Sequence, residues 1–317
     1  MSLLIRKPGI LTTAQDGGRF GFRKFGINPG GAMDQTAARL INILLGNSDS
    51  AAVIETHFPA CEIVFDSDSI VAIGGADLAP ELDGVPVENW RSFIAEKGAV
   101  LRFTNKYIGN RSYIAVRGGL SVPKWLGSAS TNLTAGMGGH EGRKLQAGDS
   151  IESDGAAFDR RFSGRRVAAS LIPMYRPFPT VRVIPCAEFE FLSSTGLDLL
   201  EFHDFTISNQ SNRMGFRLAG APIELDRPVE LVSSAVGYGT IQLLPDGQLI
   251  VLMADHQTTG GYPRLAQVIS RDLPLIAQLG ANDKLAFYFV DIGHAEELAM
   301  EFERELAMLK LGAMMSK

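Results

Sequence analysis

Three polar, glycine-rich segments hold the side chains that are best suited to chemistry. The first covers residues 12–34 and combines the amide of Gln15, the guanidinium of Arg19 and the carboxylate of Asp34. Its glycines allow backbone angles that other residues rarely adopt. We expect Gln15 and Arg19 to bind substrate, and Asp34 is a catalytic candidate. Two alternatives stay open, because Asp34 is also an ordinary helix N-cap residue and Arg19 could simply hold a loop.

The second segment, residues 208–215, places amide and hydroxyl side chains next to an arginine. Gln210, Asn212 and Arg213 are residue types that hydrogen-bond an amide or a carboxylate. We therefore expect these three side chains to bind substrate. As for Arg19, a purely structural role is the alternative for Arg213.

The third segment, residues 254–264, follows an apolar stretch and enters residues 262–270, which we expect to be helical. Such a strand-to-helix corner offers free backbone N–H groups to an anion. His256 is an acid–base candidate because imidazole titrates near neutral pH, and Asp255 is the carboxylate beside it. A plain turn is the alternative. If the segment is a site, we expect Asp255 and His256 to be catalytic. Substrate binding is then expected of Gln257, Thr258, Thr259, Gly260, Gly261 and Tyr262.

Several common catalytic signatures do not occur in the sequence. There is no G-x-x-x-x-G-K-[ST] phosphate loop, no H-E-x-x-H zinc pattern and no G-x-S-x-G nucleophile elbow. The five histidines show no spacing that is typical of metal ligands. We therefore expect no resident metal and no serine nucleophile.

The composition indicates a soluble globular protein and excludes several classes of partner. The 317 residues carry a formal net charge of −5, so we expect no general attraction to nucleic acid or to an anionic membrane. No stretch approaches the ~18 apolar residues of a transmembrane helix. Cys61 and Cys186 lie far apart, so a disulfide framework is not expected. These features favour a cytoplasmic protein.

The pattern of secondary structure is mainly β. Residues 34–46 predict an amphipathic helix with Asp34 at its start and Gly46 at its end, and residues 295–310 predict another. Pro245-Asp246-Gly247 predicts the turn of a hairpin. Short runs rich in β-branched and aromatic residues predict strands at 61–66, 69–74, 99–105, 112–117, 180–184, 205–208, 240–244, 248–253 and 285–290.

An eight-residue pattern, R-x-G-F-R-x-x-G, occurs at residues 19–26 and again at residues 213–220. It indicates two related domains, with chance similarity of turns as the alternative. Residues 159–182, rich in arginine and proline, lie between the copies and are typical of a linker. The arginines could alternatively grip a phosphate or an acidic partner. We expect two β domains, residues 1–165 and 166–317.

Four segments together carry a resemblance to a known family: residues 12–34, 118–127 (GGLSVPKWLG), 209–215 (NQSNRMG) and 239–263. They resemble the signatures of the biotin-dependent carboxyltransferase family, also called the allophanate hydrolase subunit 2 family. The resemblance covers residues 10–290. Ala14 and Gly30 stand where Val and Ser are usual in that family, and His256 stands where Arg is common.

The resemblance implies two tandem cyclophilin-like β-barrel domains with a few short packing helices. It also implies one component of an ATP-dependent 5-oxoprolinase complex, which opens 5-oxo-L-proline, a lactam, to L-glutamate together with A-type and B-type 5-oxoprolinase subunits. ATP is then used by the complex. Lys310 is displaced by one position from the biotin-attachment pattern A-M-K-M, so we expect no biotin on this chain. The alternatives are a carboxyltransferase of the allophanate hydrolase or urea carboxylase type, acting on another amide, and a non-catalytic regulatory partner of a kinase-inhibitor protein.

Overall fold

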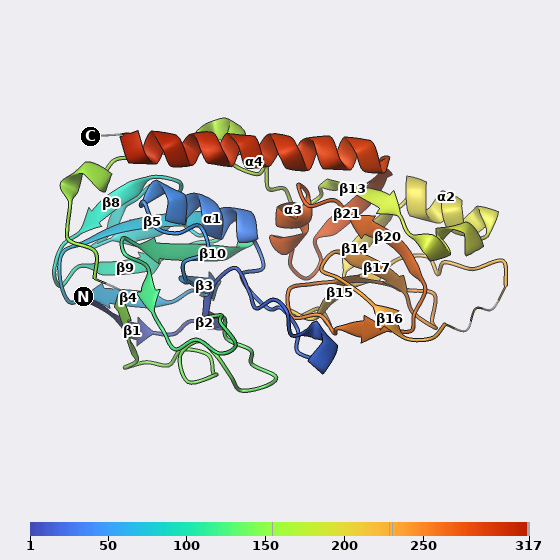
Figure 1. Ribbon diagram of the computed structural model, residues 1–317, viewed down its shortest axis with the longest axis horizontal. Helices are drawn as coiled ribbons and strands as arrows, with labels where there is room; N and C mark the ends of the chain where they lie inside the picture. The colour runs from blue at the N-terminus through green and yellow to red at the C-terminus, as the bar shows by residue number, and fades with distance from the viewer. Residues whose placement is uncertain (154, 228, 230, 316–317) are drawn as a thin grey trace. The chain divides into compact units, whose positions relative to one another are not determined.

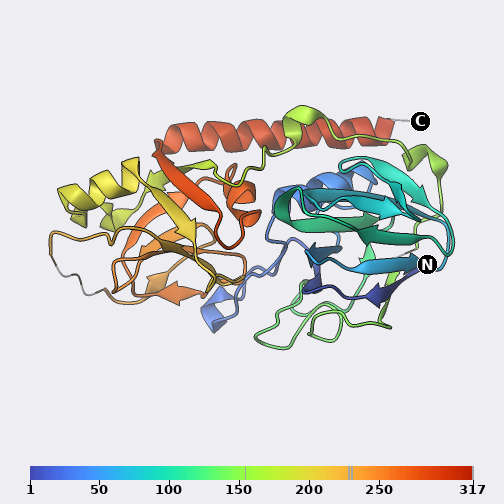
Figure 2. The same cartoon turned by 180° about the vertical axis from the view of Figure 1, so that it is seen from behind.

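The structure is a computed structural model that describes residues 1–153, 155–227, 229 and 231–315. The chain forms two compact units, each built mainly from β-strands (Figure 1; seen from behind in Figure 2). Unit 1 comprises Met1–Arg19, Gly30–Met174 and Glu303–Lys317, and unit 2 comprises Phe20–Pro29 and Tyr175–Phe302. The two units are discontinuous in sequence, since each includes a segment from the other half of the chain. The continuous domains 1–165 and 166–317 stay a prediction.

Unit 1 contains two β-sheets whose apolar side chains form one hydrophobic cluster. Ile63 and Phe65 of one sheet and Ile73 and Ile114 of the other belong to this cluster, and none of the four is more than 1% exposed. The seven-stranded sheet has the order β11 (Leu120–Ser121), β12 (Ser150–Ser153), β1 (Ser2–Lys7), β4 (Glu62–Phe65), β9 (Val100–Phe103), β6 (Pro80–Leu82) and β7 (Val85–Pro86). The five-stranded sheet has the order β2 (Thr12–Gln15), β3 (Val53–His57), β10 (Ile108–Val116), β5 (Ser69–Asp77) and β8 (Ser92–Ala95).

Unit 2 is built around a closed β-barrel, in which β13 (Thr180–Pro185) and β21 (Lys284–Phe289) pair in parallel and the other neighbours are antiparallel. The expected Pro245-Asp246-Gly247 turn joins two of its strands. A separate two-stranded ribbon pairs β16 (Ser234–Ala235) with β19 (Thr259–Gly260). The barrel order is β13 (Thr180–Pro185), β20 (Arg264–Val268), β17 (Thr240–Leu243), β18 (Leu249–Leu252), β15 (Gly215–Ala219), β14 (Asp204–Ile207) and β21 (Lys284–Phe289), which closes on β13.

The described residues contain four α-helices and four short 3₁₀ helices. The α-helices are α1 (Gln35–Leu44), α2 (Ser194–Phe202), α3 (Leu273–Ala277) and α4 (Ile292–Met315), and the 3₁₀ helices are η1 (Arg23–Phe25), η2 (Arg160–Phe162), η3 (Ala169–Leu171) and η4 (Ala187–Phe191). Among them, no helix combines the length and the hydropathy needed to cross a membrane. The expected fold class, mainly β with a β-barrel and few helices, is confirmed. Two details differ from the expectation. Two β-barrels were expected, and the closed barrel among the described residues is that of unit 2. The helices were expected to be short, and α4 has 24 residues.

The expected helix at residues 262–270 is wrong, because Arg264–Val268 forms strand β20. This strand pairs with β13 on one side and β17 on the other, so long-range pairing overrides the local pattern. The repeated R-x-G-F-R-x-x-G pattern also takes two different structures. Its first copy contains the 3₁₀ helix η1, and its second copy contains strand β15. The copies therefore do not mark equivalent elements.

The arginine-rich stretch 159–182 contacts the rest of the protein through an ion pair and a hydrogen bond. Arg182 makes a bidentate pair with the buried Asp272, whereas the pair of Arg161 with Asp159 at 2.8 Å lies within the stretch. Arg165 donates to the carbonyl of Ala313 at 2.9 Å, near the end of α4. These contacts favour the structural interpretation of the stretch over an anion-binding one.

The start of α1 gives a test of the role of Asp34. Its Oδ1 accepts the Ala37 N–H at 2.8 Å, which satisfies a donor that has no partner within the helix. We expect Asp34→Ala to lower the free energy of unfolding by about 1 kcal/mol, and Asp34→Ser to retain most of it, because serine also caps helices. Urea unfolding followed by circular dichroism measures both. Equal loss in the two variants would contradict the capping role.

Candidate functional site

In unit 1, Asp16 ties the first glycine-rich segment to residues 128–131. Its Oδ1 accepts hydrogen bonds from the Gly18 N–H at 2.7 Å and from the Ser128 and Ser130 hydroxyls at 2.6 Å each. Its Oδ2 accepts the Ala129 N–H at 2.6 Å. A carboxylate that is only 9% exposed requires such donors, because an unpaired charge is costly to bury. Asp16 therefore organises two loops around itself.

Arg19 and Gln15, which we expected to bind substrate, are buried beside these loops. Arg19 donates from Nη2 to the carbonyl of Ser130, and its guanidinium lies 4.8 Å from the centre of the Trp125 ring. Gln15 donates from Nε2 to the carbonyl of Thr131 at 3.3 Å. In this structure both side chains hold loops, and substrate binding by either stays a prediction.

The glycines at 138 and 139 permit a close approach in the same region. Both have a positive φ, 71° and 57°, which favours glycine. A Cβ atom at Gly138 would collide with the carbonyl oxygen of Ser130, and one at Gly139 would collide with the Thr131 hydroxyl. These two glycines are therefore explained by the close packing of one loop on another.

Asp34 is fully buried at the start of α1, in a hydrogen-bond network that includes Glu55. Its backbone N–H donates to the Tyr113 hydroxyl at 2.8 Å, and that hydroxyl donates to Glu55 Oε2 at 2.9 Å. The Met33 N–H donates to the same oxygen at 2.9 Å. Burial raises the pKa of Tyr113 well above its usual value, and the nearby negative charge of Glu55 raises it further. The geometry makes Asp34 a cap, and its catalytic role stays a prediction.

Glu55 is 1% exposed and central to this network, but its sequence context did not mark it as a site residue. The available signal was a carboxylate directly after two apolar β-branched residues in the strand V-I-E-T-H. Buried carboxylates are rare unless they are paired, so such a residue points to a network. Its partners lie far from it in sequence and could not be read from the pattern.

In unit 2, the second and third segments meet through an ion pair between Arg213 and Asp255. Arg213 Nε lies 2.8 Å from Asp255 Oδ2, and Nη2 lies 3.2 Å from Oδ1. The Asp255 N–H also donates to the carbonyl of Arg213 at 2.8 Å. The guanidinium that sequence analysis offered to a substrate carboxylate is thus bonded to a carboxylate of the protein. Arg213 is 7% exposed and Asp255 is 8% exposed, so this is a buried ion pair that joins two loops.

His256 follows this ion pair and is 2% exposed. Its Nδ1 donates to the carbonyl of Gln257 at 2.5 Å, which fixes the tautomer of the neutral ring and leaves the lone pair on Nε2. Burial lowers the pKa of His256 below its usual value of 6.5, and the charge of Arg23 lowers it further. The hydrogen bond to Gln257 and the charge of Asp255 act in the opposite direction. The imidazole is therefore neutral at neutral pH and suited to accept a proton or a hydrogen bond.

The other expected substrate-binding residues of unit 2 differ in exposure. Gln210, Asn212, Gln257, Thr259 and Tyr262 are exposed, Thr258 and Gly261 are half-buried, and Gly260 is buried. The expected strand-to-helix corner is absent, because residues 259–260 form strand β19 and residues 264–268 form β20. Free helical N–H groups therefore do not serve an anion here. Asn212 also has a local role, since its Oδ1 accepts the Met214 N–H at 2.8 Å.

Two residues of the segment Phe20–Pro29 also contact this loop, and sequence analysis did not assign them to a site. Asn28 Nδ2 donates to the carbonyl of Asp255 at 2.8 Å. Arg23 Nη2 donates to the carbonyl of Val236 and, at 3.5 Å, to that of Thr258. A signal for Arg23 was present, because it is the second arginine of the R-x-G-F-R-x-x-G pattern.

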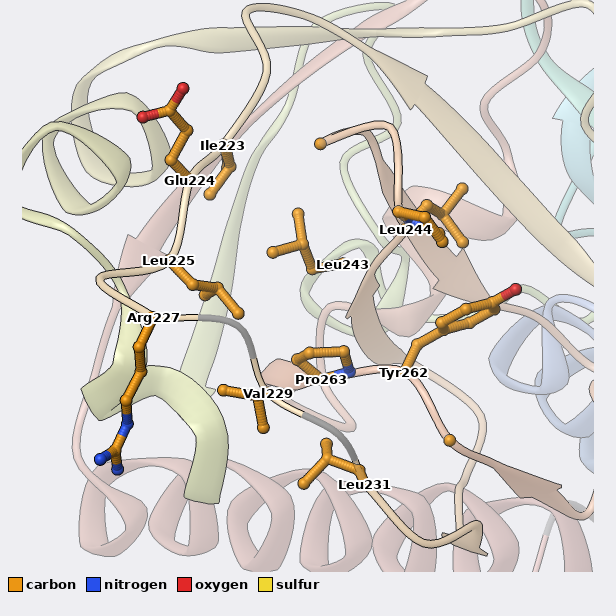
Figure 3. Close-up of a pocket in the computed structure, with 13 residues that line it drawn as sticks. Ile223, Glu224, Leu225, Arg227, Val229, Leu231, Leu243, Leu244, Tyr262 and Pro263 are labelled. Carbon is orange, nitrogen blue, oxygen red and sulfur yellow. The ribbon is translucent and has the colours of Figure 1, made fainter.

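A pocket of about 820 Å³ in unit 2 includes Gly261 and Tyr262 in its wall. The side chains of Leu225, Leu243 and Pro263 face its interior (Figure 3). The guanidinium of Arg227 and the carboxylate of Glu224 point away from it (Figure 3), and Arg227 lies over the Phe191 ring at 5.1 Å. Among the described residues of its wall, therefore, apolar side chains face the interior, and the charged groups do not converge as binding of a small lactam requires.

No group of three or more His, Cys, Asp or Glu side chains within the described part of the chain is arranged to hold a metal ion. The chemical resources of the unit 2 loops are therefore a neutral imidazole, a buried ion pair that positions it, and exposed amide and hydroxyl groups. Such a set can bind and orient an amide by hydrogen bonds and can accept a proton from an attacking nucleophile.

Comparisons with known proteins extend over almost the whole chain. The C subunit of the 5-oxoprolinase of Haemophilus influenzae is 36% identical over 298 residues, which cover 94% of each chain. The protein of the same name from Escherichia coli is 35% identical over 308 residues, which cover 97% of each chain. Both relatives match this chain end to end rather than through one segment.

A solved structure shows the same fold within a larger enzyme. The urea amidolyase of K. lactis superposes with a TM-score of 0.91 and 24% sequence identity, over 97% of this chain and 20% of that one. The carboxyltransferase domain, subdomain A and B, matches residues 25–289, which is most of the chain. This chain therefore belongs to the carboxyltransferase domain family, subdomain A and B.

Proposed function

We propose that this chain is one component of an ATP-dependent 5-oxoprolinase complex that opens 5-oxo-L-proline to L-glutamate in the cytoplasm. The observation that carries the proposal is the end-to-end similarity to two proteins that are named as the C subunit of 5-oxoprolinase. A protein with that name requires other subunits, and we assign these roles to A-type and B-type 5-oxoprolinase subunits. The chain is then active only within that complex.

The chemistry of the substrate indicates what the site must supply. A lactam is a resonance-stabilised amide, so its opening requires activation of the carbonyl, attack by water, and a proton for the ring nitrogen as the C–N bond breaks. In unit 2 we assign to His256 Nε2 the acceptance of a proton from that water and its return to the ring nitrogen, with Asp255 and Arg213 fixing the backbone from which the imidazole projects. The exposed groups nearby bind the edge and carboxylate of the substrate: Gln210, Asn212, Gln257, Thr258, Thr259 and the backbone of Gly260 and Gly261.

Phosphate groups such as those of ATP often bind where a glycine-rich segment enters a helix, as one does at the start of α1. The Asp34 carboxylate already caps this helix, so a phosphate does not fit there. We derive no step through ATP on this chain and assign its use to the complex. Biotin attachment does not fit Lys310 either, because this residue lies within α4 and its ammonium contacts Asp49 at 2.9 Å.

A second candidate function is that of a carboxyltransferase of the allophanate hydrolase or urea carboxylase type. The family match and the superposition on the K. lactis urea amidolyase favour it. In that case the amide to be bound is urea or allophanate, and the biotin belongs to another protein. The same site residues serve either substrate, because both are amides.

Reconstitution distinguishes these functions. We expect the chain, mixed with its A-type and B-type partners, to release glutamate from 5-oxo-L-proline only when ATP is present. Glutamate is measured by coupled enzymatic detection, and urea is tested in parallel. Turnover of urea alone would favour the second candidate. Assembly without turnover of either substrate would favour a regulatory protein.

Replacement of His256 tests the site within that assay. We expect His256→Asn to reduce turnover by at least ~10²-fold, the usual contribution of a general acid or base. The asparagine amide can still donate to the Gln257 carbonyl, so the loop and assembly should be unchanged by size-exclusion chromatography. Full turnover by this variant would remove His256 from the mechanism while leaving the function of the complex in place.

The pH dependence of turnover follows from the neutral imidazole. Because the pKa of His256 is lowered and its neutral form is the active one, we expect kcat/KM to hold down to a pH below 6.5 and to fall as pH drops further. Rates measured across pH with the reconstituted complex test this. A limb centred above pH 6.5 that is lost in His256→Asn would contradict the direction of the shift.

A further inference from the structure

The segment Phe20–Pro29 holds the backbone on both sides of His256. Asn28 donates to the carbonyl of Asp255, the residue before it, across a sequence separation of 227 residues. Arg23 donates to the carbonyl of Thr258, two residues after it, across 235 residues. Arg23 also donates to the carbonyl of Val236, whose own N–H donates to Thr258. One short segment therefore braces the His256 loop at both ends.

Arg23 also acts on His256 through its positive charge. Asp255 is the nearest carboxylate in the sequence, but its charge is balanced by the bidentate contact with Arg213. The hydrogen bonds of Arg23 go to neutral carbonyl groups, and no carboxylate among the described residues pairs with it. Arg23 is exposed, so water screens its positive charge in part, but that charge still opposes protonation of the buried His256 ring.

We propose that Arg23 is a positioning residue of the unit 2 site. It holds the 255–258 backbone so that the Nδ1 proton of His256 stays on the Gln257 carbonyl, and its charge keeps the ring neutral with the Nε2 lone pair available. Its importance for turnover rests on the proposed function. Its effect on His256 does not, because that effect belongs to the chain alone.

The direct test is a titration of the His256 ring by NMR on the isolated full-length chain. The ring signal is identified by its absence in His256→Asn. We expect Arg23→Gln to move the titration midpoint of His256 to higher pH, because a cation that opposes ring protonation has been removed. Burial also lowers the pKa of His256, so the shift should be partial.

Two control variants separate charge from structure. Arg23→Lys keeps the charge, and we expect it to leave the midpoint close to that of the parent chain. Lys24→Gln removes the neighbouring cation, which lies over the Phe25 ring at 5.0 Å, and should have no effect. An unchanged or lower midpoint in Arg23→Gln would overturn the proposal. Equal shifts in Arg23→Gln and Lys24→Gln would also overturn it, since they would reflect net charge only.

Turnover in the reconstituted complex gives a second, separate readout. We expect the acidic limb of kcat/KM to move to higher pH in Arg23→Gln and to stay in place in Arg23→Lys. Movement of the NMR midpoint without movement of the limb would refute the role of His256 in turnover and leave the role of Arg23 standing. A complex that turns over neither 5-oxo-L-proline nor urea would contradict the proposed function, and the NMR titration would still decide on Arg23.

Discussion

The buried ion pair between Arg213 and Asp255 is the contact on which the unit 2 site depends. It joins a loop that follows β14 to a loop that follows β18, and it is reinforced by a backbone hydrogen bond between the same two residues. Removing one member of such a pair leaves an uncompensated charge in a poorly hydrated place, at a cost of about 3–5 kcal/mol. The pair therefore fixes the position of the backbone immediately before His256.

In unit 1, buried carboxylates are likewise held by donors from separate parts of the chain. Asp16 is nearly buried, and four hydrogen-bond donors from two loops satisfy its oxygens. Glu55 is satisfied by a hydroxyl and a backbone N–H. In each case the need of a buried carboxylate for donors sets the path of the chain around it. Loops with many glycines allow that path, because a Cβ at Gly138 or Gly139 would block it.

The same need explains why several polar residues that suggest binding also make structural contacts. Arg19, Arg213 and Asp34 are chemically able to bind an anion or to transfer a proton, but each is engaged by the protein itself. The neutral groups of the unit 2 loops are the ring of the buried His256 and the exposed amides and hydroxyls of neighbouring residues. Such groups suit an uncharged amide edge better than a phosphate.

Sequence determined much of the fold. Strands such as β5 and β13 and the hairpin at Pro245-Asp246-Gly247 were predictable because their side-chain patterns and turn residues act locally. Helix α1 was predictable from its capping residue and its apolar spacing. The second and third polar segments were also recognisable as polar loops, although only the fold shows that they meet.

Tertiary structure decided the rest, because the deciding contacts join distant parts of the chain. Residues 264–268 became a strand only through pairing with β13 and β17. Arg23 reached the His256 loop, and Glu55 reached the start of α1, through neighbours that no local pattern reveals. A sequence shows which side chains are able to carry charge or donate hydrogen bonds. Only the fold shows which of them the protein has already used to satisfy its own buried groups.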